Sequence, residues 1–485
     1  MVCYRRWGHN EGDEPRFTQP KLYKAIAKHR NPRDLYAEKL LEQGVIEKGH
    51  AQKLEKEYKN KLEKKLEDSR KEDKTEITAI MKDAWAGFHH AQEDKMVQKV
   101  NTTFPLQTLT QVAKAITQLP KGKKFLRKTT KLIEARRAMY FDHNKLDWAM
   151  AELLAYGSLL KEGHDVRMSG QDVERGTFSH RHAVLKVEES EEEVTLLNQL
   201  KGKQGDFYIY NSLLSEYGVV GFDYGYAMAS PNTLTLWEAQ FGDFSNGAQI
   251  MIDQYISSGE DKWKTQNGLV MLLPHGYEGQ GAEHSSGRME RYLQGCAKDN
   301  MFIANCTSPS NMFHLLRRQM KVNYRKPLVV FTPKSLLRHP KVVSTKEEFA
   351  HGSFKMLMDD PTAKPEKVKT LVFLTGKFYY DLLQKKEKDK RGDVALIRIE
   401  QLFPLPTDAM GAIIKKYKNA NDVVWAQEEP KNMGAYSYLL MHYAPSRTWR
   451  ACSRRVYAAP AAGSSMRSKA RHAKVIESVF DKNVK

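Results

Sequence analysis

Three polar and aromatic segments, each directly after a strand-like apolar run, hold the side chains best suited to chemistry. They occupy residues 211–216, 238–244 and 274–286. In an open parallel sheet, ligands bind outside the carboxyl ends of the strands. We therefore expect the three segments to meet at one edge of a sheet and to form a ligand site there.

Two histidines of the third segment, His275 and His284, are candidates for proton transfer. They share a loop with three glycines, and an imidazole changes charge near neutral pH, which suits general acid–base catalysis. A loop histidine that only makes hydrogen bonds is the alternative. No further pair of ligands at zinc spacing accompanies them, so the sequence predicts no metal site here.

Glu216 is predicted to begin a helix, where the positive end of the helix dipole favours a carboxylate. Three glycines follow on one face of this helix, at positions 218, 221 and 225. Each costs about 1 kcal/mol relative to alanine, and a face without side chains allows another backbone, a partner helix or a ligand to approach closely. Glu216 is therefore either an ordinary first-turn glutamate or a carboxyl group buried at an interface.

Alternating strand and helix patterns from about residue 146 onward must position these segments. They predict an α/β fold with a doubly wound, mostly parallel sheet for residues 146–344. A stretch at residues 345–368 with two prolines and several lysines indicates a linker, after which the alternation resumes. Residues 345–485 are predicted to form a smaller C-terminal α/β domain.

The first 145 residues have a different character. Residues 1–3 are apolar and a loop follows them, a pattern typical of the end of a strand. A domain seldom begins in this way, so residues 1–30 are predicted to be the remnant of a further domain. Residues 31–145 are helical and charged, which indicates a linker. Apolar residues recur at every fourth position in part of it and predict a narrow stripe on a solvated helix: Leu54, Tyr58, Leu62 and Leu66.

Composition and charge argue against several other classes of protein. Of the 485 residues, 41% are hydrophobic, which is enough for packed cores. No apolar run is long enough to span a bilayer, and four dispersed cysteines fit a reducing compartment.

The formal net charge of +19 would suit nucleic acid, but no nucleic-acid motif accompanies it. A solvated basic surface is the preferred interpretation. A basic interaction protein, which binds complex partners or nucleic acid, is the alternative. Four basic residues are also expected at the surface, with an anionic effector site as their alternative role: Arg317, Arg318, Lys334 and Arg338.

Several long motifs, in the family's order and across essentially the whole chain, resemble those of the thiamine-diphosphate-dependent 2-oxoglutarate dehydrogenases. The related 2-oxoadipate-type enzymes share many of them. The motifs are YRRWGHNEGDEP (4–15), GQDVERGTFSHRHA (170–183), WEAQFGD (237–243), HGYEGQGAEHSS (275–286), PKSLLRHP (333–340), RIEQ (398–401) and WAQEE (425–429).

The resemblance implies a transketolase-like fold and the cofactors thiamine diphosphate and Mg²⁺. It implies oxidative decarboxylation of 2-oxoglutarate in the tricarboxylic acid cycle, with transfer of the succinyl group to the lipoyl group of a dihydrolipoyl succinyltransferase. The glycine face at residues 218–225 favours a homodimer, and the expected compartment is the bacterial cytoplasm, with the mitochondrial matrix as the alternative.

The resemblance assigns roles to the proton-transferring groups. Glu216 matches the glutamate that hydrogen-bonds a ring nitrogen of the cofactor's aminopyrimidine, and burial would favour its protonated form. His284 matches the histidine that faces the reaction intermediate. His275 is the weaker candidate.

The aromatic part of the site follows from the same resemblance. A ring should stack on the aminopyrimidine, and Phe244 matches it best, with Phe241 as the second choice. Gln240 lines the same turn.

One departure from the family is large. Everything expected before Tyr4 is missing, including a Gly-Asp…Asn site for Mg²⁺ and the contacts to the diphosphate. We therefore expect the chain to be inactive alone, or active only if another polypeptide contributes the missing half. An inactive fragment or a misannotated gene product is the alternative.

Overall fold

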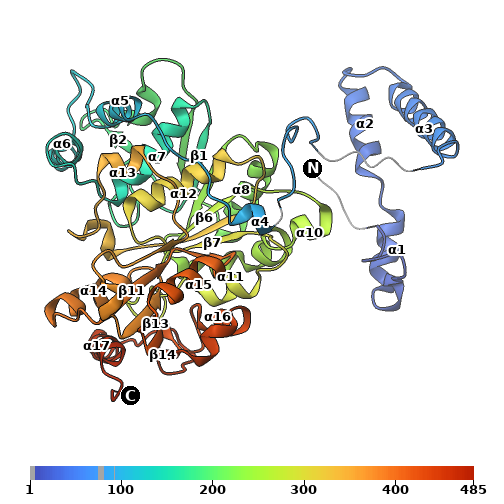
Figure 1. Cartoon of the computed structure of the whole chain (residues 1–485). Coiled ribbons are helices and arrows are strands. Elements are labelled where there is room, and N and C mark those ends of the chain that lie inside the picture. The colour runs from blue at the N-terminus through green and yellow to red at the C-terminus, as the bar shows by residue number, and fades with distance from the viewer. Residues whose placement is uncertain (1–5, 75–80, 92, 485) are drawn as a thin grey trace. The chain divides into compact units, whose positions relative to one another are not determined.

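The computed structural model describes residues 6–74, 81–91 and 93–484. The chain divides into two compact units, Met1–Ile80 and Met81–Lys485 (Figure 1). The apolar stub at residues 1–3, predicted as the end of a strand, lies outside the described residues. No helix of the described part is both long and apolar enough to cross a bilayer.

The first unit is helical. Its helices are η1 Pro15–Phe17, α1 Pro20–Lys28, α2 Pro32–Glu42 and α3 His50–Ser69. Three of them begin at proline, whose missing N–H is not needed in the first turn. The predicted apolar stripe lies on α3, where its four side chains are more than half exposed. Among residues 6–74 none is buried, so the described part of this unit has no core of its own.

A seven-stranded sheet forms the centre of the second unit. Its strands are β1 Val166–Gly170, β4 Phe207–Asn211, β5 Leu234–Glu238, β6 Val270–Pro274, β7 Phe302–Ala304, β8 Leu328–Thr332 and β12 Gln401–Phe403. Their order is β12-β7-β8-β6-β5-β1-β4, and every pair is parallel except the edge pair β12–β7. This confirms the predicted α/β class with a mostly parallel sheet.

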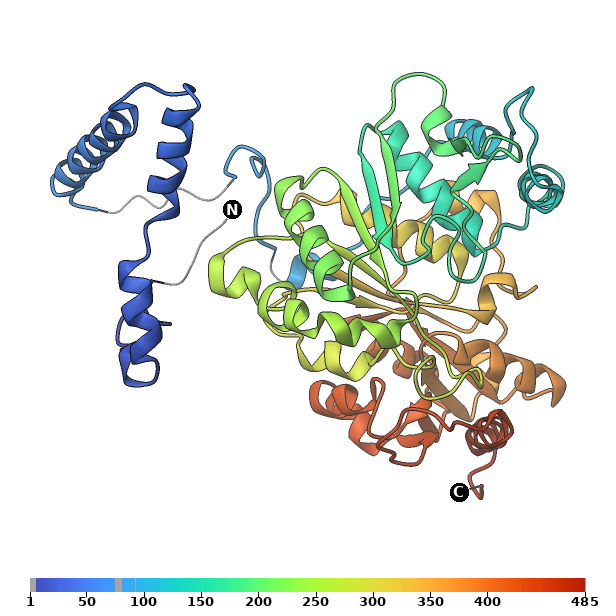
Figure 2. The same ribbon diagram turned by 180° about the vertical axis from the view of Figure 1, so that it is seen from behind.

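Helices cover both faces of this sheet (Figure 2). Successive side chains of a strand point to opposite sides, so the apolar side chains on each face need helices of their own to bury them. Leu236 of β5 belongs to a core cluster shared with α7 Trp148–Lys161 and α12 Pro309–Lys321. Trp237, the next residue, belongs to a second cluster shared with α8 Glu216–Ala229. The sheet is therefore doubly wound.

Residues 81–145, predicted as part of a linker, belong to the second unit. Leu109 and Val112 are buried on α5 and join the core cluster that contains α7. The compact units divide at residue 80, between the predicted boundaries at 30 and 145, and the boundaries stay predictions.

The elements of this region and of the loops around the sheet are α4 Glu93–Met96, α5 Leu106–Ile116, α6 Arg127–Phe141, β2 Val184–Lys186, β3 Glu193–Thr195, η2 Leu196–Gln199, η3 Gly242–Ala248, α9 Gln249–Met251, η4 Ile252–Ile256, α10 Gly259–Trp263, α11 Met289–Gln294 and η5 Ser335–Arg338.

A second, five-stranded sheet forms the C-terminal part of this unit. Its strands are β9 Leu357–Met358, β10 Thr370–Leu374, β11 Val394–Ile399, β13 Asp422–Pro430 and β14 Arg450–Arg454, in the order β14-β13-β10-β11-β9. The helices are α13 Lys346–Ala350, η6 Pro365–Lys367, α14 Phe378–Lys388, α15 Thr407–Lys416, α16 Tyr436–His442, η7 Ala444–Thr448 and α17 Ser465–Phe480. Just after β11 the chain leaves this sheet and forms β12 at the edge of the large one, so backbone hydrogen bonds tie the two sheets together.

Candidate active site

Three aromatic rings from two of the predicted segments meet beyond the carboxyl ends of β5 and β6. The ring centroids of Phe241 and His284 are 4.6 Å apart, and those of Phe244 and His284 are 5.6 Å apart. The two phenylalanine centroids are separated by 5.9 Å. All three pairs meet nearly edge to face, the favourable arrangement for aromatic rings. We call Phe241, Phe244 and His284 the ring cluster.

Glu216 lies next to the turn that carries Phe244. It is the first residue of α8, as predicted, and is half-buried. Its carboxyl group packs against Gly247 of η3, where an added Cβ would lie 3.1 Å from Glu216 Oε2. The absence of a side chain at Gly247 therefore leaves room for the carboxyl group against η3, the element that carries Phe244.

The glycine face of α8 has little chain against it. An added Cβ at Gly218 would meet Leu214, one at Gly221 would meet Met251, and one at Gly225 would meet nothing within 4 Å. The neighbouring apolar side chains are exposed: Leu213, Leu214, Tyr217, Phe222 and Ile250. Within a single chain, this face is open and apolar.

Lys334 is part of the site, although the sequence placed it on a solvated surface. It is buried, and its Nζ donates to Gln280 Oε1 at 2.5 Å and to the backbone oxygen of His284. The same ammonium group lies 5.8 Å from the centroid of Phe241. Burial lowers the pKa of Lys334. Lys334 thus fixes the loop that carries His284, a long-range contact that no local pattern could reveal.

The expectation of a solvated basic surface is also wrong for two of the other three basic residues. Arg317 is fully buried and donates to Glu162 Oε1 at 3.0 Å. Arg318 is buried as well, and its Nη1 donates to Gln401 Oε1 at 2.7 Å. Only Arg338 is exposed. The two buried arginines join elements of the core and face no solvent.

His275 does not reach the ring cluster. Its ring is buried, Nε2 lies 2.7 Å from Glu429 Oε1, and Nδ1 accepts the N–H of Gly287 at 3.1 Å. This pattern places the ring proton on Nε2 and occupies both nitrogens. His275 therefore connects the loop to the C-terminal part of the unit and has no nitrogen free for substrate.

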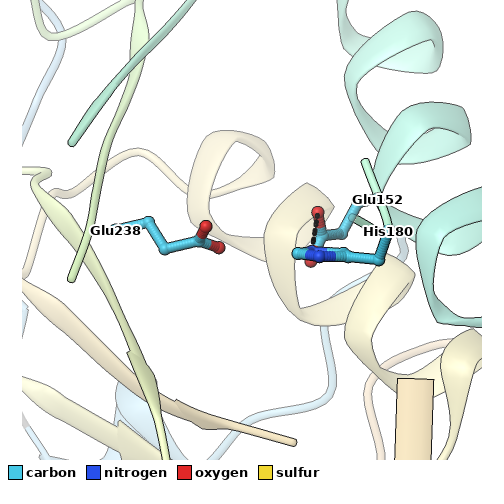
Figure 3. Close-up of side chains that lie close together, drawn as sticks. All are labelled: Glu152, His180 and Glu238. Atoms are coloured by element: carbon cyan, nitrogen blue, oxygen red, sulfur yellow. Dashed lines mark ion pairs between the residues drawn. The ribbon is translucent and has the colours of Figure 1, made fainter. Parts of the chain in front are cut away.

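Gln240, the remaining candidate, is half-buried directly before Phe241. Its position depends on the end of β5, where Glu238 belongs to a buried charge network. Figure 3 shows Glu238 pointing toward Glu152 and His180, with ligand-type atoms of all three within 4.8 Å of one another.

An arginine side chain already binds both carboxylates of this trio. Arg181 is fully buried, and it donates from Nε to Glu152 Oε2 at 3.0 Å. It also donates two hydrogen bonds to Glu238, from Nη1 to Oε1 at 2.9 Å and from Nη2 to Oε2 at 2.5 Å. Burial raises the pKa of Glu152 to about 6, and the charge of Arg181 opposes that rise. A cation would have to displace this guanidinium, so the trio is better suited to holding the end of β5 than to binding a metal.

The loop that carries Arg181 also supports the ring cluster directly. Phe178 packs edge-on against Phe241 with centroids 5.5 Å apart. Arg338 holds this loop by donating to the backbone oxygens of Phe178 and Ser179. The motif at residues 170–183, which had no role assigned from the sequence, therefore positions the aromatic part of the site.

A second trio, Asp381, Glu428 and His472, lies farther along the chain. A lysine occupies its centre: Lys377 Nζ is 2.7 Å from Asp381 Oδ2 and 3.1 Å from Glu428 Oε2. Burial raises the pKa of Asp381, but the bonds to His472 and Lys377 outweigh it and lower the pKa to about 2. This trio is an ion-pair network at the docking site of α17.

Comparisons with known proteins agree with this architecture. Residues 144–340 match the family model of the transketolase pyrimidine binding domain, and residues 343–480 match that of the 2-oxoglutarate dehydrogenase C-terminal region. Residues 1–78 match the dehydrogenase E1 component. The chain belongs to the 2-oxoglutarate dehydrogenase E1 family. Membership confirms the transketolase-like fold expected from the motifs.

Bacterial relatives give the extent of the match. The 2-oxoglutarate dehydrogenase E1 components of Brucella canis, Brucella suis and Brucella ovis are each 47% identical to the chain over 452 residues. This covers 90% of the chain and 45% of each relative. The chain therefore spans less than half the length of these curated relatives.

The residues present fit one end of thiamine diphosphate. A flat aminopyrimidine needs a carboxyl group for its ring nitrogen and an aromatic surface for its face. Glu216 beside Gly247 offers the first, and the ring cluster offers the second. Lys334, whose Nζ lies 5.8 Å from the centroid of Phe241, is already bound to Gln280 and to the backbone oxygen of His284. The fit is therefore to the pyrimidine end of the cofactor.

Proposed function

We propose that the chain contributes the pyrimidine-binding half of a thiamine-diphosphate-dependent active site that decarboxylates 2-oxoglutarate. The observation that carries this proposal is that Glu216 packs against Gly247 of η3, the same element that carries Phe244 of the ring cluster. Membership in the 2-oxoglutarate dehydrogenase E1 family supports the choice of substrate over 2-oxoadipate.

Each residue then has one task. Glu216 hydrogen-bonds a ring nitrogen of the aminopyrimidine, Phe244 stacks on its face, and Phe241 supports Phe244. His284 faces the reacting carbon and moves a proton there. Bound thiamine diphosphate supplies a nucleophilic thiazolium carbon for the 2-oxo group. Gln240 completes the turn beside the rings, and His275 positions the loop through Glu429.

We further propose the partners implied by the family. The succinyl group passes to the lipoyl group of a dihydrolipoyl succinyltransferase. The open apolar face of α8 supports a homodimer, because its exposed side chains and bare glycines allow a second helix to approach closely. The expected compartment, bacterial cytoplasm or mitochondrial matrix, stays a prediction.

These 485 residues are proposed to need a second polypeptide for turnover. The groups described above fit the pyrimidine end of the cofactor, and we propose that Mg²⁺ and the diphosphate are bound by a second polypeptide. The first unit supports the proposal of a second polypeptide. Its apolar side chains are exposed, and none of its described residues is buried.

The test is a reconstitution. The purified chain is mixed with thiamine diphosphate, Mg²⁺, 2-oxoglutarate and an artificial electron acceptor, with and without the amino-terminal half of the Brucella canis relative. We expect turnover only in the mixture, and loss of at least about a hundredfold of it with Glu216→Gln, a typical effect of removing a general acid–base group.

The matched control is Glu189→Gln, an exposed glutamate in the turn between β2 and β3. It should leave turnover unchanged. Turnover by the chain alone would contradict the need for a second polypeptide. A folded mixture that binds thiamine diphosphate without turnover would support the alternative of an inactive family member.

A further inference from the structure

A groove of about 670 Å³ lies between α5, the end of α7 and the residues that follow η2. Lys161, the last residue of α7, lines the groove, and the first strand of the large sheet begins shortly afterwards at Val166. The groove therefore lies at the amino-terminal edge of this sheet, whereas the ring cluster lies beyond the carboxyl ends of the strands. None of the ring cluster residues lines it.

The charged side chains that line the groove are all cationic in the described part of the chain. They are Lys114, Lys121, Lys161 and Lys201, and no carboxylate accompanies them. Lys161 is already engaged, because its Nζ donates to the backbone oxygens of Lys201 at 2.7 Å and of Lys203 at 3.2 Å. The other three lysines are exposed, and none of them pairs with a carboxylate of the described residues. The groove thus has three ammonium groups whose charge is not balanced.

The chain itself shows what covers the adjoining basic loop. Five of the six residues at 188–193 are glutamates, and they lie at the turn between β2 and β3. Glu192 pairs with Lys123, and Glu188 Oε2 lies 3.1 Å from Lys124 Nζ. The backbone N–H of Glu188 also donates to the backbone oxygen of Lys124 at 2.8 Å. An acidic stretch of polypeptide therefore neutralises this loop but leaves the lysines of the groove uncovered.

The floor of the groove is apolar. It is formed by the side chains of Val112, Ala115, Leu119, Pro120 and Leu200. An apolar side chain placed on this floor would be removed from water. Among the described residues, no aromatic ring lines the groove, so it lacks the stacking surface that binds single-stranded nucleic acids. The groove therefore favours a ligand that is both acidic and aliphatic.

Packing fixes both walls of the groove. α5 contacts α7 at Gly157, where an added Cβ would lie 2.3 Å from Cγ1 of Val112, so the two helices approach as closely as a glycine allows. Lys161 fixes the opposite wall through its two hydrogen bonds to the backbone after η2. A site that is already formed loses little conformational entropy when a ligand binds.

A second hollow, of about 440 Å³, continues the groove toward α6. Lys114, Gln118 and Leu119 line both hollows, so the two are adjacent. Arg137 of α6 adds a cation to the second hollow, against one carboxylate, Glu134. A surface that continues past two helices suits a length of polypeptide better than a compact small molecule. The amide of Gln118 can also donate to and accept from the backbone of such a segment.

We propose that this groove docks an acidic segment of a partner protein, in which carboxylates lie on both sides of an aliphatic side chain. The carboxylates pair with Lys114, Lys121 and Lys201, and the aliphatic side chain lies over Leu119 and Leu200. The partner binds at the edge of the sheet away from the ring cluster, so it leaves the candidate active site open. This docking does not depend on the proposed reaction.

Fluorescence anisotropy of the purified chain with a labelled octapeptide tests the docking site. The probe has the sequence Glu-Glu-Leu-Glu-Glu-Leu-Glu-Glu. We expect saturable binding that weakens as the salt concentration rises, because salt screens exposed charges. A second peptide with alanine in place of both leucines should bind about tenfold more weakly, because it removes less apolar surface from water.

The combined substitution Lys114→Glu, Lys121→Glu and Lys201→Glu should raise the dissociation constant of the octapeptide by about tenfold or more, since three exposed attractions become repulsions. All three lysines are exposed, so the fold should be kept. The matched control reverses three exposed lysines around η6 that line neither hollow: Lys364→Glu, Lys367→Glu and Lys369→Glu. The control has the same net charge and should bind the octapeptide as the unsubstituted chain does.

Absence of saturable binding, or an equal loss of affinity in the two combined variants, would overturn the docking site. Equal affinity for the leucine and alanine peptides would overturn the role of the apolar floor. An octanucleotide of thymidine is the remaining probe and should bind more weakly than the octapeptide. Tighter binding of this oligonucleotide would overturn the acidic peptide as the occupant and assign the groove to nucleic acid.

Discussion

Arg181 Nη2 lies 2.5 Å from Glu238 Oε2, and both side chains are buried. Glu238 is the last residue of β5, two positions before Gln240, and Arg181 also binds Glu152 of α7. The guanidinium group thus connects the core helix, the motif loop and the strand whose end leads to the ring cluster. A salt bridge in this position fixes geometry as much as it contributes stability.

Arg181→Met is expected to lower the free energy of unfolding by about 3–5 kcal/mol, because two buried carboxylates lose their cation. Urea unfolding followed by circular dichroism measures this change. The control is Arg175→Met in the same loop, since Arg175 and its partner Asp172 are substantially exposed. Such a surface pair contributes about 1 kcal/mol or less. A similarly small effect of Arg181→Met would show that the network is not needed for stability.

Gly247→Ala should weaken thiamine diphosphate binding by the reconstituted enzyme without unfolding the chain. The new Cβ would lie 3.1 Å from Glu216 Oε2, so the carboxyl group must shift by a few tenths of an ångström from the position proposed to bind the aminopyrimidine. Fluorescence titration with the cofactor measures the loss. Gly411→Ala is the control: its Cβ meets nothing within 4 Å, and alanine in α15 should raise stability by about 1 kcal/mol. Unchanged cofactor affinity in Gly247→Ala would contradict the assigned position of Glu216.

Gly225→Leu tests the proposed homodimer. Within one chain an added Cβ at this position meets nothing within 4 Å, so the fold of a single chain should tolerate the leucine. Close packing of a second chain on the same face should not. Sedimentation velocity is expected to show a dimer for the unsubstituted chain and a monomer for the variant. A dimer in both cases would place the interface elsewhere.

Asp223 should make the stability of the chain depend on pH. Burial raises its pKa from 3.8 to about 6, although Ser169 donates to it and Arg167 lies 3.1 Å away. Between these two pH values the folded state binds the proton and the unfolded state releases it. Stability is therefore highest below the lower value and falls as pH rises toward the upper one, by about 3 kcal/mol in total.

Asp223→Asn removes this proton, so its stability relative to the original chain should rise across the same pH range and then stay constant. Urea unfolding at a series of pH values measures the difference. A difference between the two chains that does not change with pH would show that Asp223 is not titrating there.

The sequence was informative about the fold because its signals are local. Strand-like runs followed by polar loops predicted the parallel sheet, and strand ends on a shared edge predicted that Phe241, Phe244 and His284 would lie together. The beginning of α8 at Glu216 also follows from a local pattern. The motifs also point to the family, because they are local stretches of sequence.

Only the tertiary structure separated His284 from His275, which share one loop. His275 is turned toward Glu429, a residue 154 positions away, and no periodicity encodes that contact. Arg181, Lys334 and Arg317 were beyond local reasoning for the same reason: a buried charge is stable only beside a partner that folding brings from elsewhere in the chain. Sequence by itself determined which groups are available at the sheet edge, and long-range packing decided which of them point into the site and which hold it in place.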